Sequence, residues 1–252
     1  MSEHSDKPGL PEIDVREWGG KKDGERQSMD RRLFMQLLVF DCPQDRDPDE
    51  PVEALIAGLR EAGLGAVVYD DVNAPLGVGL LSWSDDPAFF AKRLRPVFRD
   101  ARVRVLRPRP DHTMIGRTYG SGYEPNLEHW LLARPVDNVL AEESRFAVWY
   151  PLRRSGAFAR LDKAEQSAIL REHAAIGLAY GQKGLATDVR LACYGIDARD
   201  NEFVIGLIGK DLHPLSHVVQ TMRGTRQTSE FIVSMGPFFT GLVRWRSAGG
   251  AR

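Results

Sequence analysis

The segment that decides the fold begins with Phe146-Ala147-Val148-Trp149-Tyr150-Pro151-Leu152 and ends at Tyr180. The apolar stretch predicts a buried strand that ends near its proline, because proline cannot donate to a sheet ladder. Asp162 is followed three residues later by Glu165, which resembles a capping box at the start of a helix. The sequence therefore predicts a strand, a short basic turn and a helix in this order.

The predicted helix carries one histidine on its apolar side. Ile169, His173, Ile176 and Tyr180 follow at spacings of four, three and four residues, so that all four share one helix face. An inward histidine on an apolar face is more often a core residue bonded to a carbonyl than a ligand. Spacing alone therefore favours a structural role.

The surrounding residues resemble the haem-binding half of the chlorite dismutase family, which includes the peroxide-dependent coproheme decarboxylases. The resemblance covers residues 146–245 and is carried by Trp149-Tyr150-Pro151-Leu152, Arg153-Arg154, Glu172-His173-Ala174-Ala175-Ile176-Gly177 and Tyr180. It implies a haem, either haem b or coproheme, whose iron is bound by His173 in an apolar slot lined by Ile169 and Ile176. The spacing from Tyr150 to His173 resembles the actinobacterial decarboxylases.

The resemblance also implies roles outside the helix. Tyr150 matches the tyrosine that forms a radical in the decarboxylases, and Arg154 matches a basic residue beside the haem propionates. Arg223 and Thr228 match residues that anchor the propionates, with Arg226 as a competing match for the arginine. Considered one at a time, these residues also have simpler explanations. Tyr150 can be an ordinary aromatic residue of a strand, and the charged residues of 223–226 can be the solvated end of a helix.

The distal side of the implied haem differs from true chlorite dismutases, which carry a catalytic arginine there. Alignment from the two ends of the intervening loop gives Ala186 or Asp188 at that position, while Arg190 faces the same side as Asp188 if the strand alternates. The glutamate that orients the ligand histidine in those enzymes aligns with Ile208. These departures argue against conversion of chlorite to chloride and oxygen.

The leading interpretation is a haem-dependent oxidoreductase that decarboxylates coproheme with hydrogen peroxide, or that has related weak peroxidase activity. Ala157-Phe158-Ala159-Arg160 replaces an aromatic run of the decarboxylases, so turnover is a weaker expectation than haem binding. The alternatives are a non-catalytic haem or porphyrin sensor or carrier, and an assembly module without haem. The family forms ring-like homo-oligomers, commonly pentamers, so an oligomer is expected.

The order of elements repeats a β-α-β-β-α-β unit twice, which is the ferredoxin-like pattern. The fold class is therefore α+β, with tandem ferredoxin-like units that form a dimeric α+β barrel within one chain. The first unit is predicted from strands at 33–40, 66–69, 77–83 and 103–106 and helices at 52–62 and 86–98. The second is predicted from strands at 146–152, 189–194, 203–208 and 238–245 and helices at 162–180 and 212–222.

These elements divide the chain into five segments. They are a flexible N-terminal arm at 1–30, a first unit without cofactor at 31–106, a connecting loop or lid at 107–144, a haem-binding unit at 145–246 and a tail at 247–252. The connection of 107–144 is unusually long for a compact protein, and such connections are often functional.

Composition is that of an ordinary soluble globular protein, with 42% hydrophobic and 27% charged residues among 252. The net charge of −1 predicts no attraction to nucleic acid or to an anionic membrane. Cys42 and Cys193 fit no metal or redox pair, and the sequence shows no apolar leader, so a cytoplasmic protein is expected. His213 and His217 have a spacing that can hold zinc, but no third ligand is evident and a solvated face is favoured.

Overall fold

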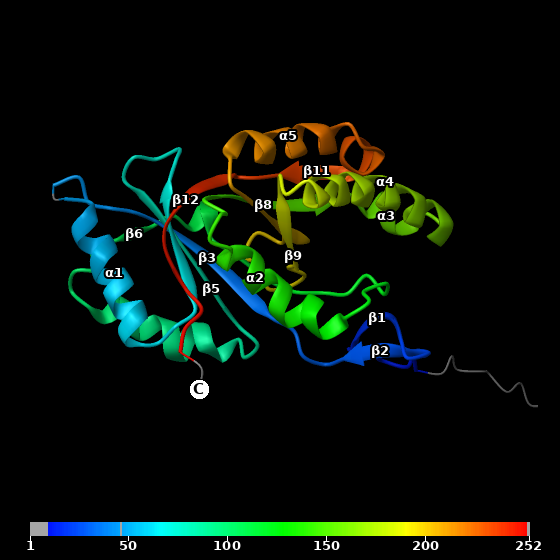
Figure 1. Ribbon diagram of the computed structural model, residues 1–252, viewed down its shortest axis with the longest axis horizontal. Coiled ribbons are helices and arrows are strands. Elements are labelled where there is room, and N and C mark those ends of the chain that lie inside the picture. The colour runs from blue at the N-terminus through cyan, green and yellow to red at the C-terminus, as the bar shows by residue number, and fades with distance from the viewer. Residues whose placement is uncertain (1–9, 46, 251–252) are drawn as a thin grey trace, which may run out of the picture.

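The structure is a computed structural model that describes residues 10–45 and 47–250. Predictions for residues 1–9 of the arm and 251–252 of the tail lie outside the described residues. A central antiparallel sheet carries α1 (Asp49–Glu61) against its N-terminal half and α3 (Gly156–Arg160), α4 (Lys163–Gln182) and α5 (Leu212–Arg223) over its C-terminal half (Figure 1). No helix in the described part of the chain is long and apolar enough to cross a membrane.

The main sheet closes into a barrel. Its ten strands include β6 (Arg107–Pro108) and β11 (Ile232–Met235), which pair at its margins, and the remaining eight form a ring. Around the ring the order is β8 (Phe146–Arg154), β10 (Phe203–Gly209), β9 (Thr187–Ala192), β7 (Met114–Arg117), β3 (Phe34–Asp41), β5 (Gly77–Ser84), β4 (Ala66–Asp71) and β12 (Phe239–Ser247). The ring closes because β12 pairs with β8. The predicted α+β class, with two units joined in one barrel, is confirmed.

The barrel interior is filled by alternate side chains of its strands, because successive residues of a strand point to opposite faces. Trp149, Tyr69 and Phe239 are the largest of them, and each is at most 1% exposed. A Cβ at Gly79 would lie only 2.4 Å from the Phe239 ring, so the interior has no room for a larger residue there. The predicted strand of 146–152 thus places every second side chain in the core.

The helices cover the outer face of the barrel to different degrees. α1 buries six residues, among them Leu55 and Leu59, against the N-terminal half of the sheet. α5 buries Leu215 and Val218 against the C-terminal half. α4 lies over the same half, yet Ile169 is the single buried residue among its 20. The inner side of α4 is therefore less completely packed than that of α1 or α5.

Two predictions about the N-terminal part are wrong. Residues 17–29, expected to be flexible, form a hairpin of β1 (Glu17–Lys22) and β2 (Glu25–Met29), whose turn residues Asp23 and Gly24 have positive φ angles. The strand expected at 103–106 is a turn, and β7 takes its place beside β3. Val103 and Leu106 are buried by packing against the helices and not by sheet pairing, so the apolar residues of 103–106 imitate a strand although the segment is a turn.

The connection of 107–144 is only partly a loop. It contributes β6 and β7 to the sheet and continues through η4 (His129–Ala133) into α2 (Arg134–Leu140). α2 buries Val139 against the barrel core. Residues 118–133 connect β7 to α2. Within this segment the Trp130 ring contacts Arg190 of β9.

Candidate functional site

The candidate site begins with a row of side chains that crosses three neighbouring strands. Tyr150 of β8 is paired with Ile205 of β10, which is paired in turn with Arg190 of β9. Their chain neighbours Trp149 and Val189 belong to the barrel core. Alternation therefore places Tyr150, Ile205 and Arg190 on the outer face of the sheet. This face is the floor of the site.

Helix α4 forms the roof above this floor. Ile176 and Tyr180 pack against the apolar cluster that contains Tyr150 and Ile205. His173 lies one turn before Ile176 on the same helix face and is only partly buried. We name the region between α4 and the outer face of β8, β9 and β10 the slot. Its walls are mainly apolar, and its roof helix is loosely packed.

His173 has a defined hydrogen-bond partner at the end of α5. Its Nδ1 lies 3.4 Å from Oγ1 of Thr225, which is buried in the turn after that helix. The single hydroxyl hydrogen of Thr225 is directed to the carbonyl oxygen of Met222, 2.7 Å away. Oγ1 of Thr228, 3.3 Å away, is a second acceptor for the same hydrogen. With its hydrogen directed to either oxygen the hydroxyl accepts from His173, so this arrangement favours the tautomer in which the imidazole donates from Nδ1. This tautomer leaves the lone pair on Nε2, the atom that could bind a metal.

The charges around His173 keep its ring neutral. Burial lowers the pKa of His173, and the positive charge of Arg190 lowers it further, against the opposing effects of Asp188 and Glu172. Burial alone would raise the pKa of Asp188, but the Arg190 and Arg134 cations bring it below its ordinary value. The site therefore combines a neutral imidazole with an ionised carboxylate at ordinary pH.

Asp188 and Arg190 form one cluster with the connection. Oδ1 of Asp188 accepts a hydrogen bond of 2.6 Å from Nη2 of Arg134, and its Oδ2 lies 3.0 Å from Nε of Arg190. The guanidinium groups of Arg134 and Arg190 lie over the Trp130 ring, 4.5 and 5.0 Å from its centroid. Ala186, the other distal candidate, is buried in the apolar cluster just before β9. Asp188 and Arg190 are thus the polar groups of the floor at β9.

Tyr150 and Arg154 share the outer face of β8. The Tyr150 ring stacks on Phe238 with 4.6 Å between centroids, and burial raises its pKa well above the ordinary value, so that the phenol stays protonated. The guanidinium of Arg154 lies over the rings of Phe158 and Phe203, and its Nε is 3.5 Å from Oε2 of Glu202. Arg154 therefore already has an aromatic and an ionic partner.

An open pocket of about 340 Å³ lies beside the slot. Arg223 and Thr228 line it together with residues 232–235, and Oγ1 of Thr228 is 3.3 Å from Oγ1 of Thr225. Arg226 instead forms ion pairs with Glu165 and Glu230 on the surface. Of the two arginines that the sequence left as alternatives, Arg223 is the one at the pocket.

The remaining sequence candidates lie around the slot. Ile169 is buried with Phe158 and Phe231 near the start of α4. His217 contacts the Tyr180 hydroxyl through Nδ1, and its ring centroid is 5.9 Å from that of His213. Among the described residues no group of three or more metal-binding side chains is present.

Comparison with known protein families identifies the family of this chain. The family described as chlorite dismutase matches residues 109–244, more than half of the chain. This chain belongs to the chlorite dismutase family. The match includes the whole slot as well as η4 and α2 of the connection, whereas the resemblance seen in the sequence began only at residue 146. A search of curated proteins gives no match.

Solved structures share the fold of this family member. A haem-binding protein from Thermus thermophilus superposes with a TM-score of 0.64 at 18% identity, covering 91% of this chain and 92% of that one. Chlorite dismutase from Candidatus Nitrospira defluvii, solved with imidazole, superposes with a TM-score of 0.62 at 13% identity, covering 85% and 92%. At such identities the likeness shows that the architecture is the same.

The sequence did not identify three residues of the site, namely Thr225, Trp130 and Arg134. The sequence aligned Ile208 with the glutamate that orients the ligand histidine in the chlorite dismutases, but Ile208 points into the barrel core and has no access to His173. Thr225 contacts the histidine instead, and it lies in a turn that no periodic pattern marks. Trp130 and Arg134 belong to the connection, and its length was the single signal that something functional lay there.

Proposed function

We propose that the slot binds a haem through Nε2 of His173 and that the protein is a haem-dependent oxidoreductase that uses hydrogen peroxide. The proposal rests chiefly on the neutral imidazole, whose Nδ1 is occupied by Thr225 and whose Nε2 carries the lone pair. A ligand to haem iron needs this tautomer, held in an orientation that a second residue fixes.

The residues of the slot suit a porphyrin. The floor offers apolar side chains, the inner side of α4 is incompletely packed, and the adjoining pocket of about 340 Å³ lies near the lower end of the usual range for small-molecule sites, roughly 300–1,000 Å³. Arg223 supplies a cation at the pocket, where carboxylates of a propionate would be stabilised by charge-assisted hydrogen bonds. When bound, the haem would supply the oxidising power that protein side chains lack.

Decarboxylation of coproheme is the reaction that we favour. For each propionate, R–CH2–CH2–COO⁻ reacts with H2O2 and H⁺ to give R–CH=CH2, CO2 and two H2O. Tyr150 suits the removal of a hydrogen atom from the propionate, because its buried phenol lies on the floor of the slot. With hydrogen peroxide as the oxidant, the phenol would lose one electron and its proton to become a neutral radical, and the hydrogen atom taken from the propionate would restore it. Arg223 lines the pocket together with Ile232 and Met235, which belong to the same apolar cluster as Tyr150, so a propionate held by Arg223 would lie on the side of the slot that carries the phenol.

The partner of His173 favours this chemistry over chlorite conversion. A neutral hydroxyl at 3.4 Å makes the imidazole a weaker electron donor than a carboxylate partner would. Arg190 on the floor is the one observation that favours chlorite chemistry, since an arginine is expected there. Its Nε, however, is held by Asp188 at 3.0 Å, so the guanidinium is already engaged by a carboxylate that it shares with Arg134. Chlorite turnover is therefore the second candidate.

The proposal is tested by adding haem or coproheme to the ligand-free protein and recording the Soret band. With coproheme and peroxide, mass spectrometry should show loss of one CO2 and two hydrogen atoms for each propionate converted. Tyr150→Phe should abolish this loss and keep the Soret band, whereas Tyr180→Phe should retain both. A Soret band without mass loss would indicate a carrier or sensor, oxygen release from chlorite would indicate the second candidate, and no Soret band would refute the proposal.

We further propose a cytoplasmic homo-oligomer, with the pentamer common in the family as the expected form. Neither nucleic acid nor membrane is expected as a partner, because the net charge is only −1. Light scattering of the purified protein gives the number of subunits and would contradict this expectation if it found a monomer.

A further inference from the structure

We propose that Trp130 is a positioning residue that fixes the guanidinium of Arg190 on the floor of the slot, on the side that faces His173. The effect of this positioning on ligand binding rests on the proposed function, whereas the contact between Trp130 and Arg190 does not depend on it. Arg190 lies over the Trp130 ring at 5.0 Å, and the strand register places it in the row with Ile205 and Tyr150 on the outer face of the sheet, which α4 covers. Trp130 comes from the connection, like Arg134, which hydrogen-bonds Asp188 in the same cluster.

Arg190 needs such support because its own strand does not confine it. Its side chain is 38% exposed, and a long side chain at that exposure can turn its charged end to solvent. Asp188 provides one restraint, through the 3.0 Å contact with Nε. A planar guanidinium also stacks well on an aromatic face, so the indole ring provides a second restraint. Together they restrain the position of the group.

The connection is itself attached to β9 at this point. Nη1 of Arg134 and Nδ2 of Asn138 both donate to the main-chain oxygen of Asp188, at 3.1 and 2.9 Å. Arg134 also shares the Trp130 ring, with 4.5 Å to the centroid. These contacts bring η4 and α2 against β9. The tryptophan is therefore held at a fixed distance from the strand that carries Arg190.

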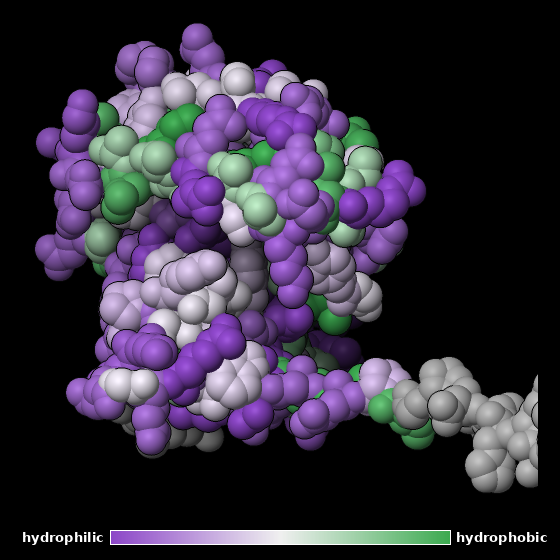
Figure 2. Space-filling model, turned by 90° about the vertical axis from the view of Figure 1, so that its right-hand side faces the viewer, coloured by the Kyte–Doolittle hydropathy of each residue, from purple (hydrophilic) through white to green (hydrophobic). Residues whose placement is uncertain are grey.

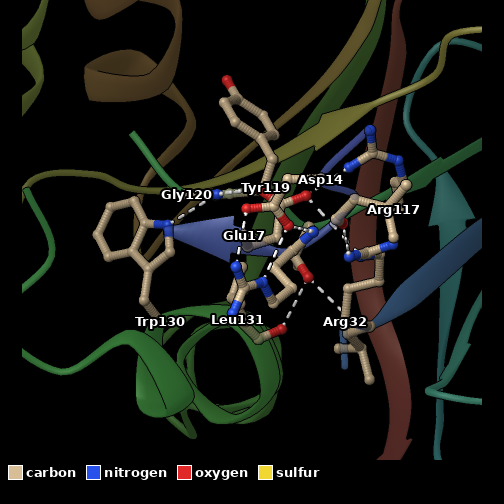
Figure 3. A network of polar contacts seen from close by, with 12 residues as sticks. Asp14, Glu17, Arg32, Arg117, Tyr119, Gly120, Trp130 and Leu131 are labelled. Carbon is tan, nitrogen blue, oxygen red and sulfur yellow. Dashed lines mark hydrogen bonds and ion pairs between the residues drawn. The ribbon is translucent and has the colours of Figure 1, made fainter. Parts of the chain in front are cut away.

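The N-terminal hairpin holds the other end of the same segment (Figure 3). The indole Nε1 of Trp130 donates to the carbonyl oxygen of Tyr119 at 3.0 Å, and the N–H of the next residue, Gly120, donates to Oε2 of Glu17 at 3.0 Å. Oε1 of Glu17 accepts a hydrogen bond of 2.8 Å from Arg117. Glu17 belongs to β1, so the hairpin fixes the loop against which the indole is bonded.

The cluster borders a pocket that opens at the surface. Trp130, Arg134 and Arg190 line it together with Thr118, Tyr119, Ser121, Glu124 and Pro135. Figure 2 shows the face of the molecule nearest the hairpin, which is hollowed between an upper and a lower half. A small anion in the slot would meet a positioned arginine and gain a charge-assisted hydrogen bond. A neutral ligand that presents no acceptor to Arg190 would gain none.

The geometry is tested in the protein without haem, by NMR of the arginine Nε–Hε groups. The Arg190 signal is identified by its absence in Arg190→Gln. It should show a ring-current displacement that Trp130→Leu removes and Trp130→Phe partly retains. Trp245→Leu, which removes a ring beneath Arg60 far from the slot, is the control and should leave the signal in place. An unchanged Arg190 signal in folded Trp130→Leu protein would overturn the proposal.

The consequence is tested in the haem-loaded protein with fluoride and imidazole as ligands. Arg190→Gln should weaken fluoride binding about tenfold, the effect of one hydrogen bond to a charged group, and leave imidazole binding unchanged. Trp130→Leu should also weaken fluoride selectively, and the double variant should be no weaker than Arg190→Gln. Equal loss of both ligands in Trp130→Leu, or no fluoride effect in either single variant, would overturn the proposal. A wild-type protein without a Soret band would refute the proposed function, and the NMR result would then decide whether Trp130 fixes Arg190.

Discussion

Replacement of Thr225 by valine tests how His173 is oriented. Valine has nearly the same shape as threonine, so the turn after α5 should keep its packing while the hydroxyl is lost. The imidazole then loses the acceptor of its Nδ1 hydrogen, which lies 3.4 Å away in the wild type. We expect the ring to keep its place on α4 but to lose the preference for the tautomer with the lone pair on Nε2.

The expected effect is small because the bond is long. A neutral hydrogen bond contributes about 0.5–1.5 kcal/mol net, and at 3.4 Å the lower end applies, about 0.5 kcal/mol. This corresponds to a roughly twofold loss of haem affinity, since 1.4 kcal/mol is tenfold. If the whole effect falls on one oxidation state, the reduction potential shifts by about 20 mV, because 59 mV is tenfold for one electron.

Spectroscopic titration with haem and a redox titration of the loaded protein measure the two quantities. Thr225→Ser keeps the hydroxyl and is the matched control, so its affinity should stay close to that of the wild type. The reasoning is refuted if serine loses as much as valine, because the hydroxyl would then not matter. A tenfold or larger loss in Thr225→Val alone would show that the bond is much stronger than its length suggests.

Three further predictions concern the protonation of the ligand, the hairpin and the barrel. The pKa of His173 is lowered below 6.5, so haem loading should persist as the pH falls below 6.5 and decline only at more acidic pH, which a loading series against pH measures. Glu17→Gln weakens the acceptor of the Gly120 N–H, so hydrogen exchange at Gly120 should become faster, as mass spectrometry of peptides from 117–124 can show. Gly79→Ala places a Cβ 2.4 Å from Phe239, and overpacking of about 1–3 kcal/mol should lower Tm by about 2–4 °C for each kcal/mol.

Matched variants separate these effects from general damage. Glu25→Gln alters an exposed carboxylate of the same hairpin and should leave exchange in 117–124 unchanged. A Cβ at Gly156 meets no atom within 4 Å, so Gly156→Ala should not destabilise the barrel. A loading midpoint above pH 6.5, equal exchange in the two glutamate variants, or an unchanged Tm in Gly79→Ala would contradict the respective prediction.

The parts of the fold that depend on local periodicity could be predicted from the sequence. The continuous apolar run of 146–152 and the spacing of Ile169, His173 and Ile176 depend on near neighbours, and β8 and α4 follow them closely. The repeated order of strands and helices also predicted the barrel. Such patterns report which face of an element is buried, and a histidine on that face is visible in the sequence.

The rest depends on contacts between distant segments. The hairpin of 17–29 has almost no apolar alternation and is held by polar groups such as Gln27, whose side chain bonds to the main chain of 124, 125 and 127. Thr225 lies 52 positions from His173, and Trp130 lies 60 positions from Arg190. Neither pair has a fixed spacing that a sequence pattern could express. The strand predicted at 103–106 was wrong for a different reason. Val103 and Leu106 are apolar and buried, but they lie in a turn and not in the sheet.

The central claim is that the imidazole of His173 binds porphyrin iron, and a haem titration of wild type and His173→Ala tests it most directly. The account predicts that the wild type gives the absorption and resonance Raman spectrum of histidine-ligated haem. His173→Ala should lose that spectrum, and imidazole added to the solution should restore it. Wild-type and variant proteins with the same Soret position and the same affinity would contradict the account.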